Sequence, residues 1–327
     1  MRLSEFWHQA LAELRSGKPV YACWVVDHRK GSPGTKSARM LLTLAGRQYG
    51  TIGGGIMEQN ELEMAAACLA ADSLPSPELQ TIEHREAAGE SASGLICGGA
   101  QTNLRFILSP QRHLEAVEAI AKAAKEEAHC VVCIDSRGIH LCGVAGPWVG
   151  DAVSLLGGDT EQWEAQAYLR NLRRIAIFGG GHCGAALARL MLGLGYAVSV
   201  IEPRREVLKA AGLPRCVTRI IQPFETGASS VAYPEDTLAV VMTYSMLSDV
   251  EALAAAIPCG FQSIGVMGSR PKIAQIRSRM LKKGIARLQV DAIRAPIGLA
   301  FNSDTPEEIA LSVAAQVLLD REGKNYG

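Results

Sequence analysis

The sequence predicts an α/β protein of two domains, with a mixed α/β fold in the N-terminal domain and a Rossmann-like parallel sheet in the C-terminal domain. The chain has 327 residues, which is longer than one average domain. An apolar run over residues 173–178 is followed by the glycine turn Gly179-Gly180-Gly181-His182-Cys183-Gly184 and then by a helix-forming stretch. Beyond this turn, strand-like and helix-like runs alternate, as is typical of a parallel sheet covered by helices on both faces.

Residues 1–145 are predicted to form the N-terminal domain. Apolar residues at helical spacing from Leu3 to Leu14 indicate an amphipathic helix at its start. The other predicted helices of this domain cover residues 56–71 and 113–127, and its strands cover residues 20–26, 40–44, 48–52, 80–86 and 102–108, with two more near residues 131 and 139.

Residues 146–172 are predicted to form a linker, with a helix over residues 160–171, and residues 173–327 to form the Rossmann-like domain. The last helix is predicted to begin at Thr305-Pro306-Glu307-Glu308, where a threonine cap is followed by a proline in the first turn and by a glutamate three residues after the cap. The remaining predicted strands of this domain cover residues 173–178, 197–201, 238–243 and 263–266, and its helices cover residues 185–194, 249–256 and 270–283.

Charge and cysteine content narrow the class of protein. Lys plus Arg total 33 and Asp plus Glu total 33, so no net charge draws the chain to nucleic acid or to an anionic membrane. We expect no membrane partner, because no apolar run reaches the roughly 20 residues that a bilayer span needs. The nine cysteines form an odd set without a secretion signal, which favours free thiols and a cytoplasmic location. Exposed edges and apolar helix faces favour a homodimer.

Cys130 and Cys133 have the spacing of a redox or metal motif. They lie in an apolar run that is typical of a buried strand, where residues three apart face opposite ways. We therefore expect both to be core residues.

The glycine turn predicts a site for a phosphate-bearing cofactor. Gly179, Gly181 and Gly184 match the dinucleotide-binding pattern, and Glu202 ends the next strand, where a ribose-binding acid belongs. Glycines let the backbone approach a phosphate at a helix N-terminus, where His182 would also lie. A Rossmann fold without a nucleotide remains an alternative.

Two further glycine turns precede predicted helices. Gly53-Gly54-Gly55 is followed by Glu58 in the first helical turn, and Gly268-Ser269-Arg270 begins another helix after a strand. Either turn suits an anion, and Arg270 adds a bidentate phosphate donor. The alternative in both places is a tight turn before a capped helix.

Cys97 precedes Gly98 and Gly99, and these small neighbours would leave its thiol accessible to a soft metal or to sulfur. Burial as a small apolar residue is the alternative. The sequence has no recognisable Ser/His/Asp arrangement or closed set of zinc ligands, which disfavours hydrolase chemistry.

In their order, these motifs resemble the xanthine dehydrogenase accessory factor (XdhC/CoxI) family over nearly the whole chain. The resemblance rests on Gly31-Ser32-Pro33, Ala38-Arg39-Met40, Gly50-Thr51-Ile52-Gly53-Gly54-Gly55-Ile56-Met57-Glu58, Cys97-Gly98-Gly99, the glycine turn, Gly265-Val266-Met267-Gly268-Ser269-Arg270, Ala295-Pro296-Ile297-Gly298-Leu299 and Thr305-Pro306-Glu307-Glu308-Ile309-Ala310.

The resemblance implies a chaperone more than an enzyme. It implies that both domains bind the molybdenum cofactor, as molybdopterin or its dinucleotide form, and protect it while a cysteine desulfurase replaces an oxo ligand with sulfur. The cofactor would then be inserted into an apo molybdenum hydroxylase of the xanthine dehydrogenase type. The cofactor contacts would come from the three glycine turns with Glu58, His182, Glu202 and Asp249, and Cys97 would be the molybdenum or sulfur contact.

The chain departs from the family pattern in three places. Gly34 stands where the family usually has an arginine, with Lys36 and Arg39 nearby as substitutes. Tyr244 replaces a histidine, and Glu202-Pro203-Arg204 replaces the commoner Asp-Asp-Arg.

Two other functions use the same residues. An NAD(P)-dependent oxidoreductase would bind its cofactor at the glycine turn and Glu202, with Asp249 or His182 as proton donor. A regulatory nucleotide-binding module would use the same fold without catalysis.

Overall fold

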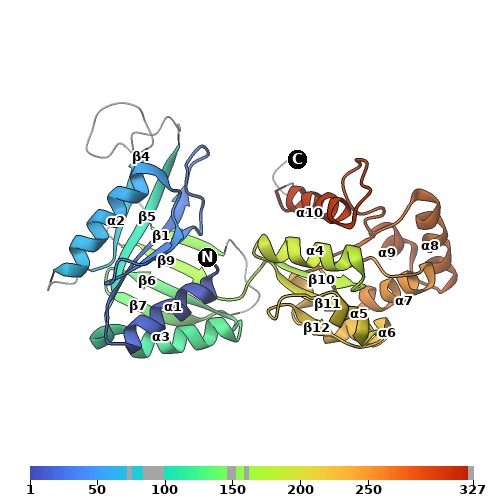
Figure 1. Cartoon of the computed structure of the whole chain (residues 1–327), viewed down its shortest axis with the longest axis horizontal. Helices are drawn as coiled ribbons and strands as arrows, with labels where there is room; N and C mark the ends of the chain where they lie inside the picture. Colours follow the sequence, from blue (N-terminus) through green and yellow to red (C-terminus); the bar gives the residue numbers. More distant parts are fainter. Residues whose placement is uncertain (72–75, 84–98, 146–151, 158–161, 323–327) are drawn as a thin grey trace. The chain divides into compact units, whose positions relative to one another are not determined.

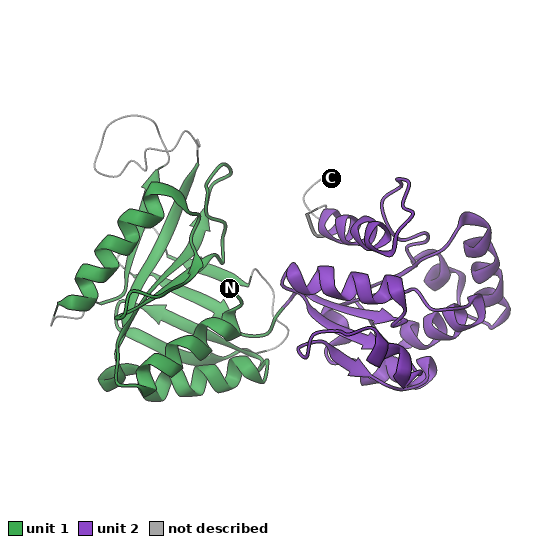
Figure 2. Ribbon diagram, viewed as in Figure 1, with its two compact units in different colours: residues 1–171 green, residues 172–327 purple. Residues whose placement is uncertain are grey.

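The computed structural model describes residues 1–71, 76–83, 99–145, 152–157 and 162–322. The chain divides into two units, unit 1 (residues 1–171) and unit 2 (residues 172–327) (Figure 2). The helices and strands of unit 1 are α1 (Leu3–Arg15), β1 (Val20–His28), β2 (Arg39–Thr43), β3 (Gln48–Thr51), α2 (Gly55–Ala70), β4 (Glu78–Glu83), β5 (Ala100–Leu108), α3 (Pro110–Lys125), β6 (Cys130–Asp135), β7 (Gly138–Gly143), β8 (Val153–Leu156) and β9 (Glu164–Tyr168).

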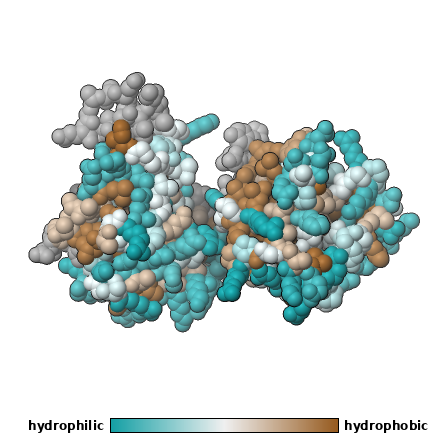
Figure 3. Space-filling view, viewed as in Figure 1, coloured by the Kyte–Doolittle hydropathy of each residue, from teal (hydrophilic) through white to brown (hydrophobic). Residues whose placement is uncertain are grey.

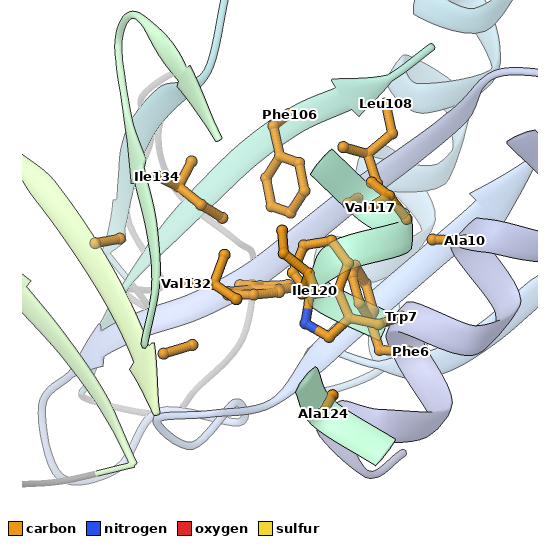
Figure 4. Close-up of a cluster of buried hydrophobic side chains, with 14 of the residues drawn as sticks. Phe6, Trp7, Ala10, Phe106, Leu108, Val117, Ile120, Ala124, Val132 and Ile134 are labelled. Carbon is orange, nitrogen blue, oxygen red and sulfur yellow. The ribbon is translucent and has the colours of Figure 1, made fainter. Parts of the chain in front are cut away.

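Two antiparallel sheets build unit 1. The first has the strand order β3-β2-β1-β5-β4 and the second the order β7-β6-β9-β8. Helices α1 and α3 lie side by side and pack with both sheets around one core (Figure 1). Phe6, Trp7, Trp24 and Phe106 form edge-to-face aromatic contacts at its centre. Figure 4 labels Phe6, Trp7 and Phe106 of this group. Such contacts add to the free energy gained by burying these large side chains.

Strand β1 is apolar from Val20 to Val26 because both of its faces are buried there. Trp24 points into the aromatic core, whereas Tyr21 and Cys23 point to the opposite face, which α2 covers. Met57 and Ala65 of α2 belong to that second cluster. The continuous apolar run in the sequence therefore reports a central strand between two packed layers.

Unit 2 has a parallel sheet of five strands in the order β12-β11-β10-β13-β14 (Figure 1). Numbered along the unit, this order is 3-2-1-4-5, as in a Rossmann fold. The elements are β10 (Arg174–Phe178), α4 (His182–Gly193), β11 (Ala197–Ile201), α5 (Arg205–Ala210), β12 (Thr218–Ile220), α6 (Phe224–Gly227), β13 (Thr237–Val241), α7 (Met246–Ala256), β14 (Ser263–Val266), α8 (Arg270–Lys282), α9 (Arg287–Asp291) and α10 (Pro306–Glu322).

Helices cover both faces of this sheet. Residues of α4 and α10, such as Leu187 and Val313, pack on the side of Ile177. Residues of α7 and α8 pack on the side of Phe178. The predicted Rossmann-like fold of the C-terminal part is therefore confirmed.

The helix predicted over residues 160–171 is wrong, and the predicted linker over 146–172 contains two strands. β8 and β9 belong to the second sheet of unit 1, and Ala165 and Ala167 are buried opposite Ile134 and Val132 of β6. Helix-forming residues occupy β9 because pairing and burial outweigh a weak local propensity. The boundary between the units falls after Asn171.

None of the helices in the described part of the chain combines the length and the apolar character that a bilayer span requires. On the face drawn in Figure 3, hydrophilic residues cover broad areas with smaller hydrophobic patches between them.

Candidate functional site

The carboxyl ends of the strands of unit 2 gather three of the predicted site segments and Thr243 at one edge of the sheet. Residues 179–184 follow β10, Glu202 follows β11, Thr243 follows β13 and residues 268–270 follow β14. β10 and β13 are neighbours, and the chain runs to opposite sides of the sheet from them. Ligands of open α/β sheets bind at this switch point.

The three glycines of the motif have different environments. A Cβ on Gly179, which has φ +112°, would lie 2.4 Å from the Met242 carbonyl oxygen, and a Cβ on Gly184 would lie 1.9 Å from the Gly179 carbonyl oxygen. A Cβ on Gly181 would meet nothing within 4 Å. The first and third glycines therefore allow the turn and the close approach of α4 to the strand, whereas Gly181 borders open space at the N-terminus of α4.

Two predicted neighbours of the turn differ in exposure. His182 is the first residue of α4 and is exposed, and its side chain makes no hydrogen bond within the described part of the chain. Cys183 is half-buried, and its pKa is raised by burial and by the charge of Glu307. Its thiol therefore keeps its proton at neutral pH, when it is a poor nucleophile.

Glu202 lies at the predicted position but is fully buried, and its carboxylate already has partners. It accepts hydrogen bonds from the backbone N–H of Gly180 at 3.0 Å and from the Arg204 backbone N–H at 3.1 Å and Nε at 2.7 Å. Burial alone would raise its pKa, but the hydrogen bonds from Arg204 and Gly180 hold it below the ordinary value. Glu202 thus stays ionised and fixes the turn and Arg204.

Arg204 was absent from the predicted site. Its guanidinium is 4.0 Å from the ring centroid of Tyr244, and its side chain is 45% exposed. Tyr244 is the residue that replaces the family's histidine, so this departure supplies an aromatic face for Arg204. An acid at a strand end followed two residues later by an arginine is the sequence signal that points to this pair.

Asp249 is fully buried and acts as a positioning residue. Its Oδ1 accepts hydrogen bonds from the Thr243 backbone N–H at 3.0 Å and Oγ1 at 2.7 Å, and the Lys272 ammonium lies 2.6 Å from its Oδ2. The ion pair joins α7 to α8, and the hydrogen bonds from Thr243 tie both to the end of β13. A proton-donor role would need an accessible carboxyl group, and Asp249 does not offer one.

The turn at Gly268 ends in an exposed helix N-terminus. Ser269 caps α8 in an extended conformation without a side-chain capping hydrogen bond, and Pro271 lies in the first turn. Arg270 is exposed and makes no ion pair among the residues that the structure describes. Arg204 and Lys272, the other two cationic residues named at this edge of the sheet, already face carboxylates. The charge of Arg270 is therefore uncompensated, which suits a phosphate.

In unit 1, three turns that are far apart in sequence come together. A Cβ on Gly53 would lie 2.7 Å from the backbone nitrogen of Gly34, and a Cβ on Gly99 would lie 2.3 Å from that of Ser32. Gln101, which is 1% exposed, lies at the centre: its Oε1 accepts hydrogen bonds from Ser32 Oγ at 2.9 Å and from the Gly34 N–H at 3.0 Å. No signal in the sequence points to Gln101, because a polar residue in a strand usually faces solvent.

The glycine at position 34, where the resembled family usually has an arginine, has a steric explanation. A Cβ at Gly34 would lie 2.2 Å from the carbonyl oxygen of Ile52, so this position leaves no room for an arginine. Arg39 is buried over the ring of Trp24, 5.8 Å from its centroid, and does not replace an exposed arginine. Cys97 and Gly98 lie outside the described residues.

Glu58 occupies the turn predicted to bind an anion. Its Oε2 accepts hydrogen bonds from the backbone N–H groups of Ile52 at 2.8 Å and Gly54 at 3.1 Å, and from Thr51 Oγ1 at 2.5 Å. A groove of about 500 Å³ beside α2 is lined in part by Glu58 and Glu63, whose charges disfavour a phosphate there. The carboxylate of Glu58 thus takes the place that an external anion would have at this turn.

Substituting Glu58 by Gln should lower the free energy of unfolding of unit 1 by about 1.5 kcal/mol at neutral pH, the lower end of the net value of a hydrogen bond to a charged group. Burial opposes ionisation of Glu58, but hydrogen bonds from Thr51, Ile52, Gln48 and Gly54 hold its pKa below the ordinary 4.5. Its contribution is therefore present above pH 4.5 and is lost as the pH falls through the lowered pKa.

Urea unfolding at neutral pH and below the lowered pKa tests this. The difference between the wild type and Glu58→Gln should shrink in acid. The control Glu63→Gln, in the same helix, should differ little from the wild type at either pH. A difference that stays constant with pH would contradict the role assigned to the Glu58 charge.

Comparisons with known proteins agree with the fold. A model of the XdhC Rossmann domain matches residues 175–317, and a model of the XdhC and CoxI family matches residues 13–75. Together they cover more than half of the chain and fall in both units. A crystal structure described as a xanthine dehydrogenase (BH1974) from Bacillus halodurans superposes with a TM-score of 0.76 at 19% identity, covering 99% of this chain and 97% of that one.

Two curated relatives from Escherichia coli strain K12 are also similar. The uncharacterized protein YqeB is 24% identical over 303 residues, which are 92% of this chain and 43% of YqeB. The chain thus spans less than half the length of that relative. The molybdenum cofactor insertion chaperone PaoD is 22% identical over 315 residues, 94% of this chain and 85% of PaoD.

Proposed function

Because this chain belongs to the XdhC and CoxI family, we propose that it is a maturation factor that binds the molybdenum cofactor and inserts it into a molybdenum hydroxylase. The cofactor would be molybdopterin or its dinucleotide form. The similarity to PaoD, whose name is that of a molybdenum cofactor insertion chaperone, supports the insertion role.

The observation that carries the proposal is the carboxyl edge of the sheet in unit 2. It presents the N-termini of α4 and α8, the open space at Gly181 and the unpaired charge of Arg270. Molybdopterin ends in a phosphate, and its dinucleotide form contains a pyrophosphate. Free N–H groups at a helix N-terminus and an arginine suit either group. Gly179, Gly184, Glu202 and Asp249 would hold this edge in shape, and His182, Gly268 and Ser269 would line it.

The proposal extends to unit 1 and to the partners. Cys97 would contact the molybdenum or its sulfur, with Gly98, Gly99 and the turn at residues 53–55 beside it. The factor would protect the cofactor while a cysteine desulfurase supplies sulfur, and would deliver it to an apo hydroxylase of the xanthine dehydrogenase type. It would act in the cytoplasm as a homodimer, as a carrier more than as an enzyme.

Binding of the cofactor is tested by purifying the chain from cells that make it and assaying oxidised pterin fluorescence and molybdenum. The wild type should carry both. Arg270→Ala should retain roughly tenfold less pterin, because it loses a charge-assisted hydrogen bond. Arg279→Ala is the matched control, since Arg279 is exposed in the last turn of the same helix.

Three outcomes would count against the proposal. Bound NAD(P) without pterin would favour an oxidoreductase or a regulatory nucleotide-binding module, and hydride-transfer activity would distinguish these two. Equal pterin content in Arg270→Ala and the wild type would remove the phosphate site from α8. Cys97→Ala that binds cofactor and supports its sulfuration as well as the wild type would contradict the role of Cys97.

A further inference from the structure

A second cluster of ligand-type side chains lies in unit 1, on the hairpin formed by β6 and β7. Cys133 pairs directly with His140, and Cys142 pairs with Val131. Residues directly opposite each other in an antiparallel pair point to the same face of the sheet, and so do residues two apart on one strand. Cys133, His140 and Cys142 therefore share one face, opposite to the face through which Val132 and Ile134 enter the core.

The three side chains converge at their ligand atoms. The Sγ atoms of Cys133 and Cys142 are 3.1 Å apart, and these atoms and a ring nitrogen of His140 all lie within 4.8 Å of one another. Cys133 is 2% exposed, Cys142 is half-buried and His140 is exposed. The cluster thus has a buried floor at Cys133 and opens to solvent beside His140.

A carboxylate emerges on the same face as the cluster. Cys133 pairs with Gln166 of the neighbouring strand β9, and Glu164 lies two residues before Gln166 on that strand. Glu164 is in turn held by Gln166, whose Nε2 donates to its Oε1 at 2.6 Å. A cation between the two sulfurs and the imidazole would replace the thiol protons, and the Glu164 charge would favour it.

We propose that Cys133, His140 and Cys142 form a site for a zinc-class divalent cation. Two thiolates and one imidazole are ligands that Zn²⁺ prefers, at about 2.3 Å for sulfur and about 2.0–2.1 Å for nitrogen. Metal binding needs only small movements of the three side chains, since the distances between neighbouring ligand atoms around a tetrahedral ion fall between the 3.1 Å and 4.8 Å found in this cluster. Three protein ligands leave the fourth position open for water or another ligand, as in zinc sites that exchange a ligand.

The third ligand distinguishes this site from a simple dithiol. A redox pair would need the two cysteines alone, whereas the structure also places His140 at the cluster from the strand position directly opposite Cys133. His140 is joined by a single intervening residue to Cys142, so both side chains emerge on one face from the same strand. This arrangement makes a metal site the better account of all three residues.

The site is tested on the full chain, purified without metal and kept reduced with a phosphine. Zn²⁺ is titrated against a chromophoric chelator, and Co²⁺ is added as a spectroscopic probe. The wild type should bind a single equivalent of Zn²⁺. Its Co²⁺ form should show sulfur-to-cobalt charge transfer and the strong visible bands of tetrahedral cobalt.

His140→Gln and Cys142→Ser should each weaken Zn²⁺ binding by more than about tenfold, a loss seen even for outer-shell partners of metal sites. His140 is exposed, so its substitution should leave the fold intact, and far-ultraviolet circular dichroism checks this. Cys216→Ser is the matched control because Cys216 is an exposed free cysteine elsewhere, and it should bind as the wild type does.

Several results would overturn the site. The first is that the reduced wild type does not bind Zn²⁺, and the second is that both variants bind it with wild-type affinity. The third is that the reduced protein takes up no metal and that Cys133 and Cys142 form a disulfide once the protein is oxidised. The outcome is independent of the cofactor proposal, because Arg270→Ala should keep its Zn²⁺ whatever its pterin content.

Discussion

Replacing Glu61 by Ala is expected to destabilise unit 1 by about 3–5 kcal/mol, the cost of breaking a buried ion pair by removing one partner. Glu61 is 2% exposed and lies on α2 beneath the first sheet. Arg105 of β5 forms a bidentate ion pair with Glu61, with its Nη2 2.6 Å from Oε2 and its Nε 2.9 Å from Oε1. The Tyr21 hydroxyl donates to the same Oε1 at 2.6 Å.

The loss would be large because the partners cannot reach water. Arg105 is only 12% exposed, so its guanidinium would remain buried without its main counter-ion. Burial and then the charge of Glu61 raise the pKa of Tyr21, so its hydroxyl keeps its proton and would lose its acceptor. The substitution thus leaves two buried donors unsatisfied.

Tryptophan fluorescence during urea unfolding measures this effect in unit 1 alone, because all four tryptophans of the chain lie in residues 1–171. Glu78→Ala is the matched control: Glu78 lies 3.6 Å from the same arginine but is 59% exposed. Its removal should cost less than about 1 kcal/mol. Similar losses in the two variants would show that the burial of Glu61 is not what matters.

Most of the Rossmann-like unit could be predicted because its signals are local. Four of its five strands are short apolar runs, and the parallel order follows from the βαβ connections. Strand β12 has no apolar run, since Thr218 and Arg219 are exposed, and it was not predicted. The separate roles of Gly179, Gly181 and Gly184 also follow from a turn, a close approach and an open helix N-terminus within six residues. The structure confirms this fold and places those glycines as the pattern implies.

Contacts between distant segments could not be predicted in this way. Glu202 and Asp249 were expected as acids facing a ligand, but Arg204 and Lys272 neutralise them in the folded unit. The sequence shows an acid at a strand end, but it does not show that a lysine 23 positions later completes the pair with Asp249. The ion pair of Asp249 thus has no local signal, whereas Arg204, the partner of Glu202, lies only two residues away.

The cysteine cluster illustrates the same limit. The spacing of Cys130 and Cys133 suggested a pair, but the two face opposite sides of β6, and both are buried as expected. The true neighbours of Cys133 come from β7, through a hairpin register that pairs residues equidistant from the turn at Asp135 and Gly138. Once that turn is located, the sequence does identify His140 as the opposite residue.

Replacing Gly184 by Ala is expected to destabilise unit 2 by about 3 kcal/mol or more, at the upper end of the cost of overpacking. The added Cβ would lie 1.9 Å from the carbonyl oxygen of Gly179 and 3.0 Å from its carbonyl carbon. Neither atom can withdraw easily, because Gly179 itself lies against the backbone of Met242. Relief would need α4 to move away from β10, which opens the core around Leu187 and Met191.

Gly181→Ala, three residues earlier in the same turn, separates this packing effect from ligand binding. Its Cβ would meet nothing within 4 Å, and its φ of −67° suits alanine, so stability should change by less than about 0.5 kcal/mol. The methyl group would nevertheless occupy the space where a phosphate is proposed to approach, and bound pterin should fall. Circular dichroism follows the melting of both units, while tryptophan fluorescence follows unit 1 alone and should be unchanged in both variants, so a change seen only by circular dichroism belongs to unit 2. If Gly184→Ala melts as the wild type does, the turn can change its conformation at little cost, contrary to this prediction. If Gly181→Ala keeps the pterin content of the wild type, the cofactor does not bind at the N-terminus of α4.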